Sequence, residues 1–260
     1  MNKYKVCWIT LCKDEMDILP FVKQYWERIG CDVVVYDNGS SDGSIEYLQS
    51  LPYATVKHFD SDGHNDVIHK QVKEQAYLEY KDDYDIIIIT DMDEVFYFND
   101  FNALCDVFIS QGYNVLATPI YTLCEAGMPL YDDSKLLHQQ CHKFYKQRMN
   151  HMQGFDDFSK LSIFNTKTTD EVKMSVGQHY VQTIPQMRIL LSNGDFNIHI
   201  NKGFGEDYYV SKRKKMGQNL SQTNIKGNMG VEYLKSENEL IQEYIEHQKN
   251  SFDINKFLKY

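Results

Sequence analysis

Residues 85–97 read DIIIITDMDEVFY and join a strongly apolar run to an acidic end. Four consecutive isoleucines are typical of a strand buried on both faces, as at the centre of a parallel sheet. Asp91, Asp93 and Glu94 follow at once, at the strand end where open α/β sheets bind ligands. Buried unpaired charge is unfavourable, so we expect a cation there, and oxygen ligands suit Mg²⁺ or Mn²⁺. An acidic turn without a ligand is the alternative.

The N-terminal third alternates between short apolar runs and helical patterns. Phe21, Tyr25 and Ile29 share one face of a helix that starts near Pro20 and stops at Gly30. We expect strands at 6–11, 32–36, 54–59 and 86–89, and further helices at 45–51 and 66–80. Such alternation implies right-handed βαβ units and a parallel sheet.

Two motifs carry a family resemblance. CKDEMDILPFVKQYWERIGCDVVVYDNGSSDGS (12–44) and TDMDEVF (90–96) resemble family 2 glycosyltransferases of the GT-A fold, closest to the bacterial capsule and lipopolysaccharide branch. Weaker matches follow in order at 160–164, 177–180, 197–202 and 214–217, although Ile200 replaces the usual tyrosine after the histidine. The resemblance covers about residues 4–217.

The resemblance implies an α/β, Rossmann-like GT-A fold, with a mainly parallel central sheet and flanking helices. The expected glycosyltransferase domain is 1–217, with a nucleotide-binding half at 1–100 and an acceptor half at 101–217. Residues 218–260 would form a small helical C-terminal extension.

The resemblance also assigns the donor site. Asp37 would hydrogen-bond the base or ribose, and a carboxylate there can accept from the imide N–H of uracil, which favours a UDP-sugar. Thr10 and Leu11 would offer backbone contacts, with Asp14 or Glu15 holding the loop. The full set of nucleotide-sugar contacts is Thr10, Leu11, Glu15, Asp37, Asn38, Asp42, Asp91, Met92 and Lys202.

Asp93 is expected to ligate the metal, since it occupies the family's metal position. GT-A enzymes commonly add a late histidine as a further ligand. His199 fits best because it sits on a short apolar strand, and His179 is the competitor. An imidazole beside carboxylates suits Mn²⁺ better than Mg²⁺. The other histidines lie in polar segments without a companion motif, and we expect no ligand role for them.

Inversion needs a general base that deprotonates the acceptor hydroxyl. Glu206 and Asp207 resemble the family's Gly-Glu-Asp motif, although an acidic pair also suits the first turn of a surface helix. Glu94 is a third candidate, either facing the sugar or bracing the site. The sequence leaves further carboxylates open at Glu125, Asp132, Asp133, Asp156 and Asp157.

Composition and charge limit the classes of binding partner. A net charge of −10 and a pI near 5.3 argue against a nucleic-acid binder. The one dense basic cluster, KRKK at 212–215, is either a solvated helix face or a contact for a diphosphate or an anionic membrane surface. Oligomeric state stays open.

Six dispersed cysteines without a C-x-x-C pair suggest a reducing compartment and no zinc site. We expect no signal peptide and no membrane-spanning helix, since no apolar run approaches the ~18 residues that a spanning helix needs. We therefore expect a cytoplasmic protein, with peripheral contact at the inner face of the membrane as an alternative.

The second half is less regular. A helix is expected at 101–111 and a strand at 114–122, beside the strand at 86–89. Residues 123–150 suit an acceptor-facing loop, and 218–230 suit a mobile loop. An amphipathic helix is predicted at 231–248, with Leu234, Ile241, Tyr244 and Ile245 on one side.

These expectations describe a metal-dependent glycosyltransferase, and the resemblance to the family implies inversion at the transferred sugar. It would move a sugar from a nucleotide diphosphate to a hydroxyl of a saccharide or lipid-linked glycan in bacterial surface polysaccharide synthesis. One alternative is a nucleotidyltransferase of similar fold, but residues 12–15 (CKDE) lack the glycines of its usual loop. The other is a non-catalytic member that binds a glycan or a partner.

Overall fold

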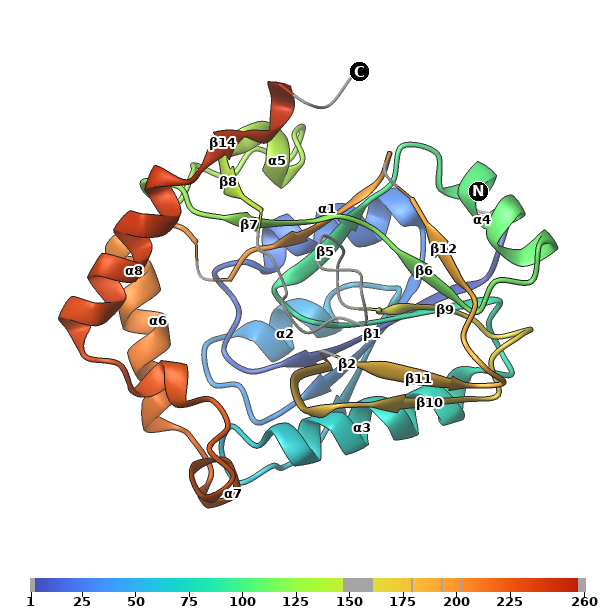
Figure 1. Ribbon diagram of the computed structural model, residues 1–260, viewed down its shortest axis with the longest axis horizontal. Helices are drawn as coiled ribbons and strands as arrows, with labels where there is room; N and C mark the ends of the chain where they lie inside the picture. Colours follow the sequence, from blue (N-terminus) through green and yellow to red (C-terminus); the bar gives the residue numbers. More distant parts are fainter. Residues whose placement is uncertain (1–2, 147–160, 179, 193, 202, 257–260) are drawn as a thin grey trace.

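The isoleucine run lies at the centre of a seven-stranded sheet in the computed structural model (Figure 1), which describes residues 3–146, 161–178, 180–192, 194–201 and 203–256. In strand β4 (Ile86–Asp91), Ile86 and Ile88 belong to one hydrophobic cluster, and Ile87 and Ile89 belong to another. The strand is thus buried on both faces, as the sequence predicts. Each buried isoleucine contributes about 1.5–3 kcal/mol of transfer free energy.

The sheet is mainly parallel. Its strand order is β12-β6-β9-β4-β1-β2-β3, and only β9 runs antiparallel to its neighbours. The strands are β1 (Val6–Cys12), β2 (Asp32–Asp37), β3 (Ala54–His58), β4, β6 (Val115–Ala117), β9 (Ile163–Asn165) and β12 (Ile189–Leu191). The carboxyl ends of β1, β2, β3 and β4 therefore lie along one edge.

Helices flank the sheet on both sides (Figure 1). Helices α1 (Leu19–Ile29), α2 (Ser44–Gln49) and α4 (Phe101–Ser110) supply side chains to the first cluster. Helix α3 (Asp66–Tyr80) and the hairpin of β10 (Glu171–Met174) and β11 (Val181–Ile184) cover the opposite face. The predicted α/β class, with a mainly parallel sheet and flanking helices, is confirmed.

A second sheet has the order β14-β8-β7-β13-β5. Its strands are β5 (Glu94–Tyr97), β7 (Ile120–Leu123), β8 (Lys143–Tyr145), β13 (Phe196–His199) and β14 (Phe252–Asp253), and a short helix α5 (Leu137–Gln140) lies between β7 and β8 in the chain. Strand β5 begins three residues after β4 ends, and it pairs antiparallel with β13. This pairing brings a segment from late in the chain to the end of β4.

The prediction of a single strand at 114–122 is wrong. The chain forms β6 in the central sheet and then β7 in the second sheet, with Pro119 between them. Proline has no N–H for a ladder, so it suits the point where the chain leaves one sheet for another. Nor does β6 lie beside β4, because β9 is inserted between them.

The C-terminal segment differs from its prediction in two places. Residues 218–230, expected as a mobile loop, contain helix α7 (Gln222–Lys226). The helix expected at 231–248 is split into a 3-10 turn η2 (Val231–Leu234) and helix α8 (Glu237–Lys249). Ser236 and Glu239 form a capping box that starts α8 afresh, and Leu234 is 56% exposed rather than on the buried face.

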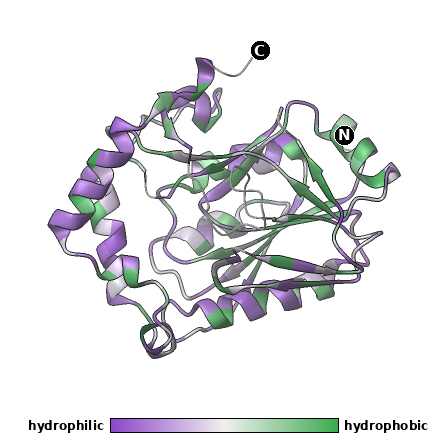
Figure 2. Cartoon of the chain, viewed as in Figure 1, coloured by the Kyte–Doolittle hydropathy of each residue, from purple (hydrophilic) through white to green (hydrophobic). Residues whose placement is uncertain are grey.

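Helix α8 packs against α6 (Glu206–Gln218) through a small cluster that includes Tyr209, Leu240 and Tyr244. Both helices carry mostly hydrophilic residues on their outer sides, whereas the strands of the sheet are mostly hydrophobic (Figure 2). After α8 the chain returns to the second sheet as β14, and the 3-10 turn η3 (Ile254–Lys256) follows. The C-terminal segment is therefore packed on the rest of the fold.

All six cysteines are buried and free. Among the helices of the described ranges, none combines the length and apolar character needed to cross a bilayer.

Candidate functional site

A cavity of about 790 Å³ opens at the carboxyl ends of β1 and β4. Its lining includes Leu11 to Glu15 at the end of β1 and in the loop that follows, Asp91 to Asp93 at the end of β4, and one side of α3. His199 and residues of α6 and η2 complete it. The cavity thus occupies the sheet edge where open α/β folds bind ligands.

Asp91 is held by a lysine from α3. Lys73 Nζ lies 2.6 Å from Asp91 Oδ1 and 3.1 Å from Gln178 Oε1, and Lys73 is only 4% exposed. Gln178 in turn donates from Nε2 to the carbonyl of Ile89, 3.1 Å away. One acidic side chain at the end of β4 therefore has its positive partner within the protein.

Asp93 lies beside His199. In the β5–β13 ladder His199 is directly opposite Glu94, and the N–H of Ile200 donates to the carbonyl of Asp93 at 2.8 Å. This register sets His199 Nε2 3.6 Å from Asp93 Oδ2, with Asp93 8% exposed. The pairing that the sequence could only suggest is a consequence of the antiparallel strand pair.

This pair fits a divalent cation. Two protein ligands that each lie about 2.0–2.2 Å from one ion are themselves about 3–4 Å apart, which the 3.6 Å separation matches. His199 Nδ1 is buried and has no hydrogen-bond partner among the described residues. An oxygen and a nitrogen ligand together suit Mn²⁺ better than Mg²⁺.

The loop after β1 is tied to α6. Asp14 accepts hydrogen bonds from Lys215 Nζ at 2.8 Å and from the N–H of Ser41 at 2.7 Å, while its carbonyl accepts from Lys212 Nζ at 3.0 Å. Burial alone would raise the pKa of Asp14, but these hydrogen bonds outweigh it and the pKa is lowered. Thr10 is fully buried and does not line the cavity, whereas Leu11 and Glu15 do.

Residues 37–44 form a tight turn after β2. Asp37 is 1% exposed, and its carboxylate accepts from the N–H groups of Gly39 and Ser40 at 2.8 and 3.0 Å. Asp42 likewise accepts from the N–H of Met16 at 2.9 Å. These carboxylates shape the loop itself, and of this turn Asn38 lines the cavity.

Helix α6 brings cations to the cavity. Lys212, Arg213 and Lys215 line it, whereas Lys214 pairs with Glu237. Arg213 is 8% exposed, and its guanidinium lies over the rings of Tyr209 and Tyr233. Part of the basic cluster at 212–215 is therefore directed to the cavity rather than to open solvent.

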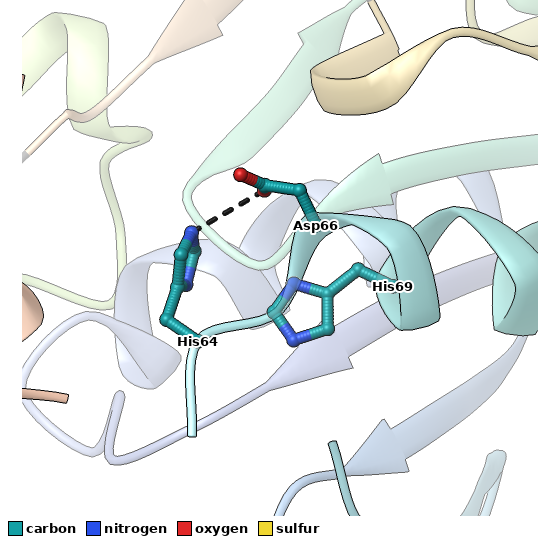
Figure 3. Close-up of side chains that lie close together, drawn as sticks. All are labelled: His64, Asp66 and His69. Carbon is teal, nitrogen blue, oxygen red and sulfur yellow. Dashed lines mark ion pairs between the residues drawn. The ribbon is translucent and has the colours of Figure 1, made fainter. Parts of the chain in front are cut away.

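A second group of metal-binding residues lies on the α3 side: His64, Asp66 and His69 (Figure 3). Burial lowers the pKa of His69 to about 4, with a further lowering by His64, so the imidazole is neutral at pH 7. Burial would raise the pKa of Asp66, but hydrogen bonds from His64 and Asn224 and the nearby histidines lower it overall. The sequence had given no indication of a ligand role for either histidine.

The remaining predicted residues have the following places. Met92 is 3% exposed and lines the cavity. Glu94, directly after Asp93, is 2% exposed and is not among the residues that line the cavity. Glu206 and Asp207 are exposed in the first turn of α6 and are not among the residues that line the cavity.

The further carboxylates do not line the cavity where the structure describes them. Glu125 accepts a hydrogen bond from the N–H of Lys143, and Asp132 accepts one from the N–H of Ser134. Asp133 does not line the cavity either. His179, Lys202, Asp156 and Asp157 lie outside the described residues.

Sequence reasoning missed the contribution of α3. Asp66, His69, Lys70 and Lys73 all line the cavity. Their spacing of three or four residues puts them on one face of a helix. The polar face of this amphipathic helix, which comes just before the acidic strand in the chain, is the sequence feature that could have indicated this contribution.

No family model matches the chain, and no curated protein matches it. Among solved structures, the chain is similar to TarS from S. aureus, with a TM-score of 0.47 and 12% identity over 88% of this chain. It spans 43% of the length of that TarS chain. A second structure, of TarS residues 1–349, gives a TM-score of 0.46 and 13% identity, covering 88% of this chain and 70% of that chain.

Proposed function

We propose that this chain is a metal-dependent glycosyltransferase that transfers a sugar from a nucleotide diphosphate, with a UDP-sugar as the favoured donor. The observation that carries the proposal is the Asp93–His199 pair, 3.6 Å apart, at the carboxyl edge of a mainly parallel sheet. It opens into a cavity of about 790 Å³, large enough for a nucleotide-sugar. The ordered motifs at 12–44 and 90–96 support the same class of reaction.

Charge in the cavity supports binding of a diphosphate. When bound at Asp93 and His199, Mn²⁺ or Mg²⁺ would neutralise negative charge on the leaving diphosphate. Lys212 and Lys215 lie across the cavity on α6, where an ammonium that already contacts Asp14 has further N–H groups for phosphate oxygens. Fixed cations aimed at developing negative charge supply the electrostatic stabilisation that usually dominates such catalysis.

The finer assignments extend this proposal. Lys202, three residues after His199 in the chain, would add a cation. Asn38 would contact the base or ribose from a turn whose backbone Asp37 fixes. The acceptor would be a hydroxyl of a saccharide or lipid-linked glycan in bacterial surface polysaccharide synthesis. It would attack the anomeric carbon of the donor sugar with inversion, and the nucleoside diphosphate would leave. Of the three candidates for the base, Glu94 is adjacent to Asp93 in the chain and opposite His199 in the ladder.

A panel of UDP-, GDP-, ADP- and CMP-sugars, assayed for metal-dependent hydrolysis, tests the function. We expect hydrolysis of at least one UDP-sugar that requires Mn²⁺ or Mg²⁺ and disappears in Asp93→Ala. Release of pyrophosphate from a sugar phosphate and a nucleoside triphosphate would instead indicate a nucleotidyltransferase. Absence of turnover and of nucleotide binding with every member of the panel would refute the proposal.

A further inference from the structure

His64, Asp66 and His69 form a compact group at the start of α3 (Figure 3). Within the part of the chain that the structure describes, they are the only group of three or more His, Cys, Asp or Glu side chains whose ligand atoms all lie within 4.8 Å of one another. His64 Nε2 is 3.3 Å from Asp66 Oδ1, and the two imidazole rings are 5.0 Å apart. All three side chains are partly buried and line the cavity.

The start of the helix fixes their relative positions. Asn65 caps α3, because its side-chain oxygen accepts from the N–H groups of Val67 and Ile68. Asp66 and His69 then lie one turn apart, three residues in sequence, on the same helix face. His64 directly precedes the cap, and Figure 3 shows its ring directed toward Asp66.

Hydrogen bonding assigns the tautomer of His69. The single hydroxyl proton of Ser61 is donated to the carbonyl of Gly63, and Ser61 Oγ also accepts from Asn38 Nδ2. His69 Nε2 lies 3.3 Å from the same oxygen, so it must be the donor in that contact. The proton is then on Nε2, and Nδ1 keeps the lone pair that a metal ion requires. A ligating histidine held through its other N–H is the usual arrangement in metal sites.

Asp66 is held from the opposite side by α7. Asn224 accepts from the N–H of Asp66 at 3.0 Å and donates from Nδ2 to Asp66 Oδ2 at 2.8 Å. Asn224 is fully buried. The second oxygen, Oδ1, is the one that faces His64. The carboxylate is therefore oriented by a residue that lies 158 positions later in the chain.

The backbone of His64 is also clamped by the C-terminal segment. Its N–H donates to the carbonyl of Asn219 at 2.6 Å, and its carbonyl accepts from the N–H of Ser221 at 3.1 Å. Gly63, with φ of +85°, permits this contact, because a Cβ there would lie 2.4 Å from the Asn219 oxygen. Each of the three candidate ligands is thus supported by contacts outside the group.

We propose that His64, Asp66 and His69 bind a divalent transition-metal ion of the Zn²⁺ or Co²⁺ class, at a site separate from the Asp93–His199 pair. Two imidazoles and one carboxylate form the ligand set of many three-ligand zinc sites, which leave the fourth position open. That position faces the cavity, where an anionic oxygen of a bound molecule completes the shell. Nitrogen ligands disfavour Mg²⁺.

This inference does not depend on the proposed function, because it concerns metal binding in the absence of any nucleotide. The probe is Co²⁺, titrated into the metal-stripped full-length chain and followed by its visible absorption. We expect one equivalent of Co²⁺ to bind at this site, and one equivalent of Zn²⁺ to displace it. The signal should survive in Asp93→Ala, which removes a ligand of the other pair.

His64→Ala and His69→Gln should each weaken this Co²⁺ binding at least about tenfold, in line with loss of a metal ligand. His142→Ala is the matched control, since that histidine is exposed and lies outside the cavity lining. Melting curves without metal establish that each variant folds; if either does not, Asp66→Asn tests the site while retaining both hydrogen bonds with Asn224. Equal Co²⁺ affinity in these variants, or loss of the signal in Asp93→Ala alone, would overturn the proposal.

Discussion

Lys73 Nζ lies 2.6 Å from Asp91 Oδ1, which joins α3 to the acidic end of β4. The two ends of this pair differ in exposure, because the lysine side chain is 6% exposed and the aspartate side chain 41%. Loss of Asp91 would therefore leave a buried ammonium without its carboxylate, whereas loss of Lys73 would leave a carboxylate that still contacts water.

Asp91→Ala should lower the free energy of unfolding by about 1.5–3 kcal/mol, the range for a hydrogen bond to a charged group. It leaves a buried ammonium with Gln178 as its remaining partner. Lys73→Met should lower the free energy of unfolding by less, because an apolar side chain of similar length fills the buried space and Asp91 keeps its contact with water. Urea denaturation of both variants measures the difference. A larger loss in Lys73→Met would contradict the asymmetry.

Asp93→Ala should reduce donor turnover at least about 100-fold and abolish Mn²⁺-dependent nucleotide binding, because it removes a charged ligand of the expected cation. The melting temperature should change little, since Asp93 lies at the cavity rather than in the core. Asp82→Ala is a control, with a side chain that is 87% exposed. Turnover equal to that of the control would remove Asp93 from the metal site.

His199→Ala should raise the Mn²⁺ concentration needed for half-maximal turnover more than His179→Ala does. The reason is that His199 Nε2 lies 3.6 Å from Asp93 Oδ2. Titrating each variant with Mn²⁺ at saturating donor gives the comparison. The reverse order would transfer the ligand role to His179.

Local sequence patterns were enough for the elements of the nucleotide-binding half. The isoleucine run predicts a strand, and the apolar spacing within 66–80 predicts a helix, from residues that are close together in the chain. Helix α3 has the predicted bounds. The order of strands in the sheet could not be predicted in this way, because β9 lies between β4 and β6 although it comes about 75 residues after β4 in the chain. No periodicity within a strand encodes which distant strand will pair with it.

The same limit applies to the site. Asp93 and His199 were predicted from the order of family motifs, and the β5–β13 register explains why they meet. The group of His64, Asp66 and His69 was missed because its support comes from Ser61 on one side and Asn224 on the other. Cysteine spacing carries no information about a metal site built from histidine and aspartate.

Acid should destabilise the fold through His138. This side chain is fully buried, with Nδ1 3.1 Å from the Tyr25 hydroxyl, and burial lowers its pKa from 6.5 to about 4. Between these two values the unfolded chain binds a proton that the folded chain does not, so the free energy of unfolding falls as pH drops through this window. The contribution of His138 is up to about 3 kcal/mol.

His138→Gln removes that titration while keeping a polar side chain near Tyr25. The variant should be less stable than the original protein at pH 8, but should lose less stability between pH 7 and pH 4.5. Urea denaturation at both pH values for both proteins gives the four free energies required. Equal losses would show that His138 does not titrate abnormally.

Uridine diphosphate with Mn²⁺ should raise the melting temperature, whereas guanosine diphosphate with Mn²⁺ should not. A ligand at 100 times its dissociation constant stabilises the folded state by about 2.7 kcal/mol, and each kcal/mol shifts the midpoint of a chain this size by about 2–4 °C. An increase of several degrees is therefore expected. The specificity would come from the turn after β2, where Asn38 lines the cavity and Asp37 fixes the backbone. The shift should vanish in Asp93→Ala and without Mn²⁺, and an equal or larger shift with the guanosine nucleotide would overturn the choice of donor.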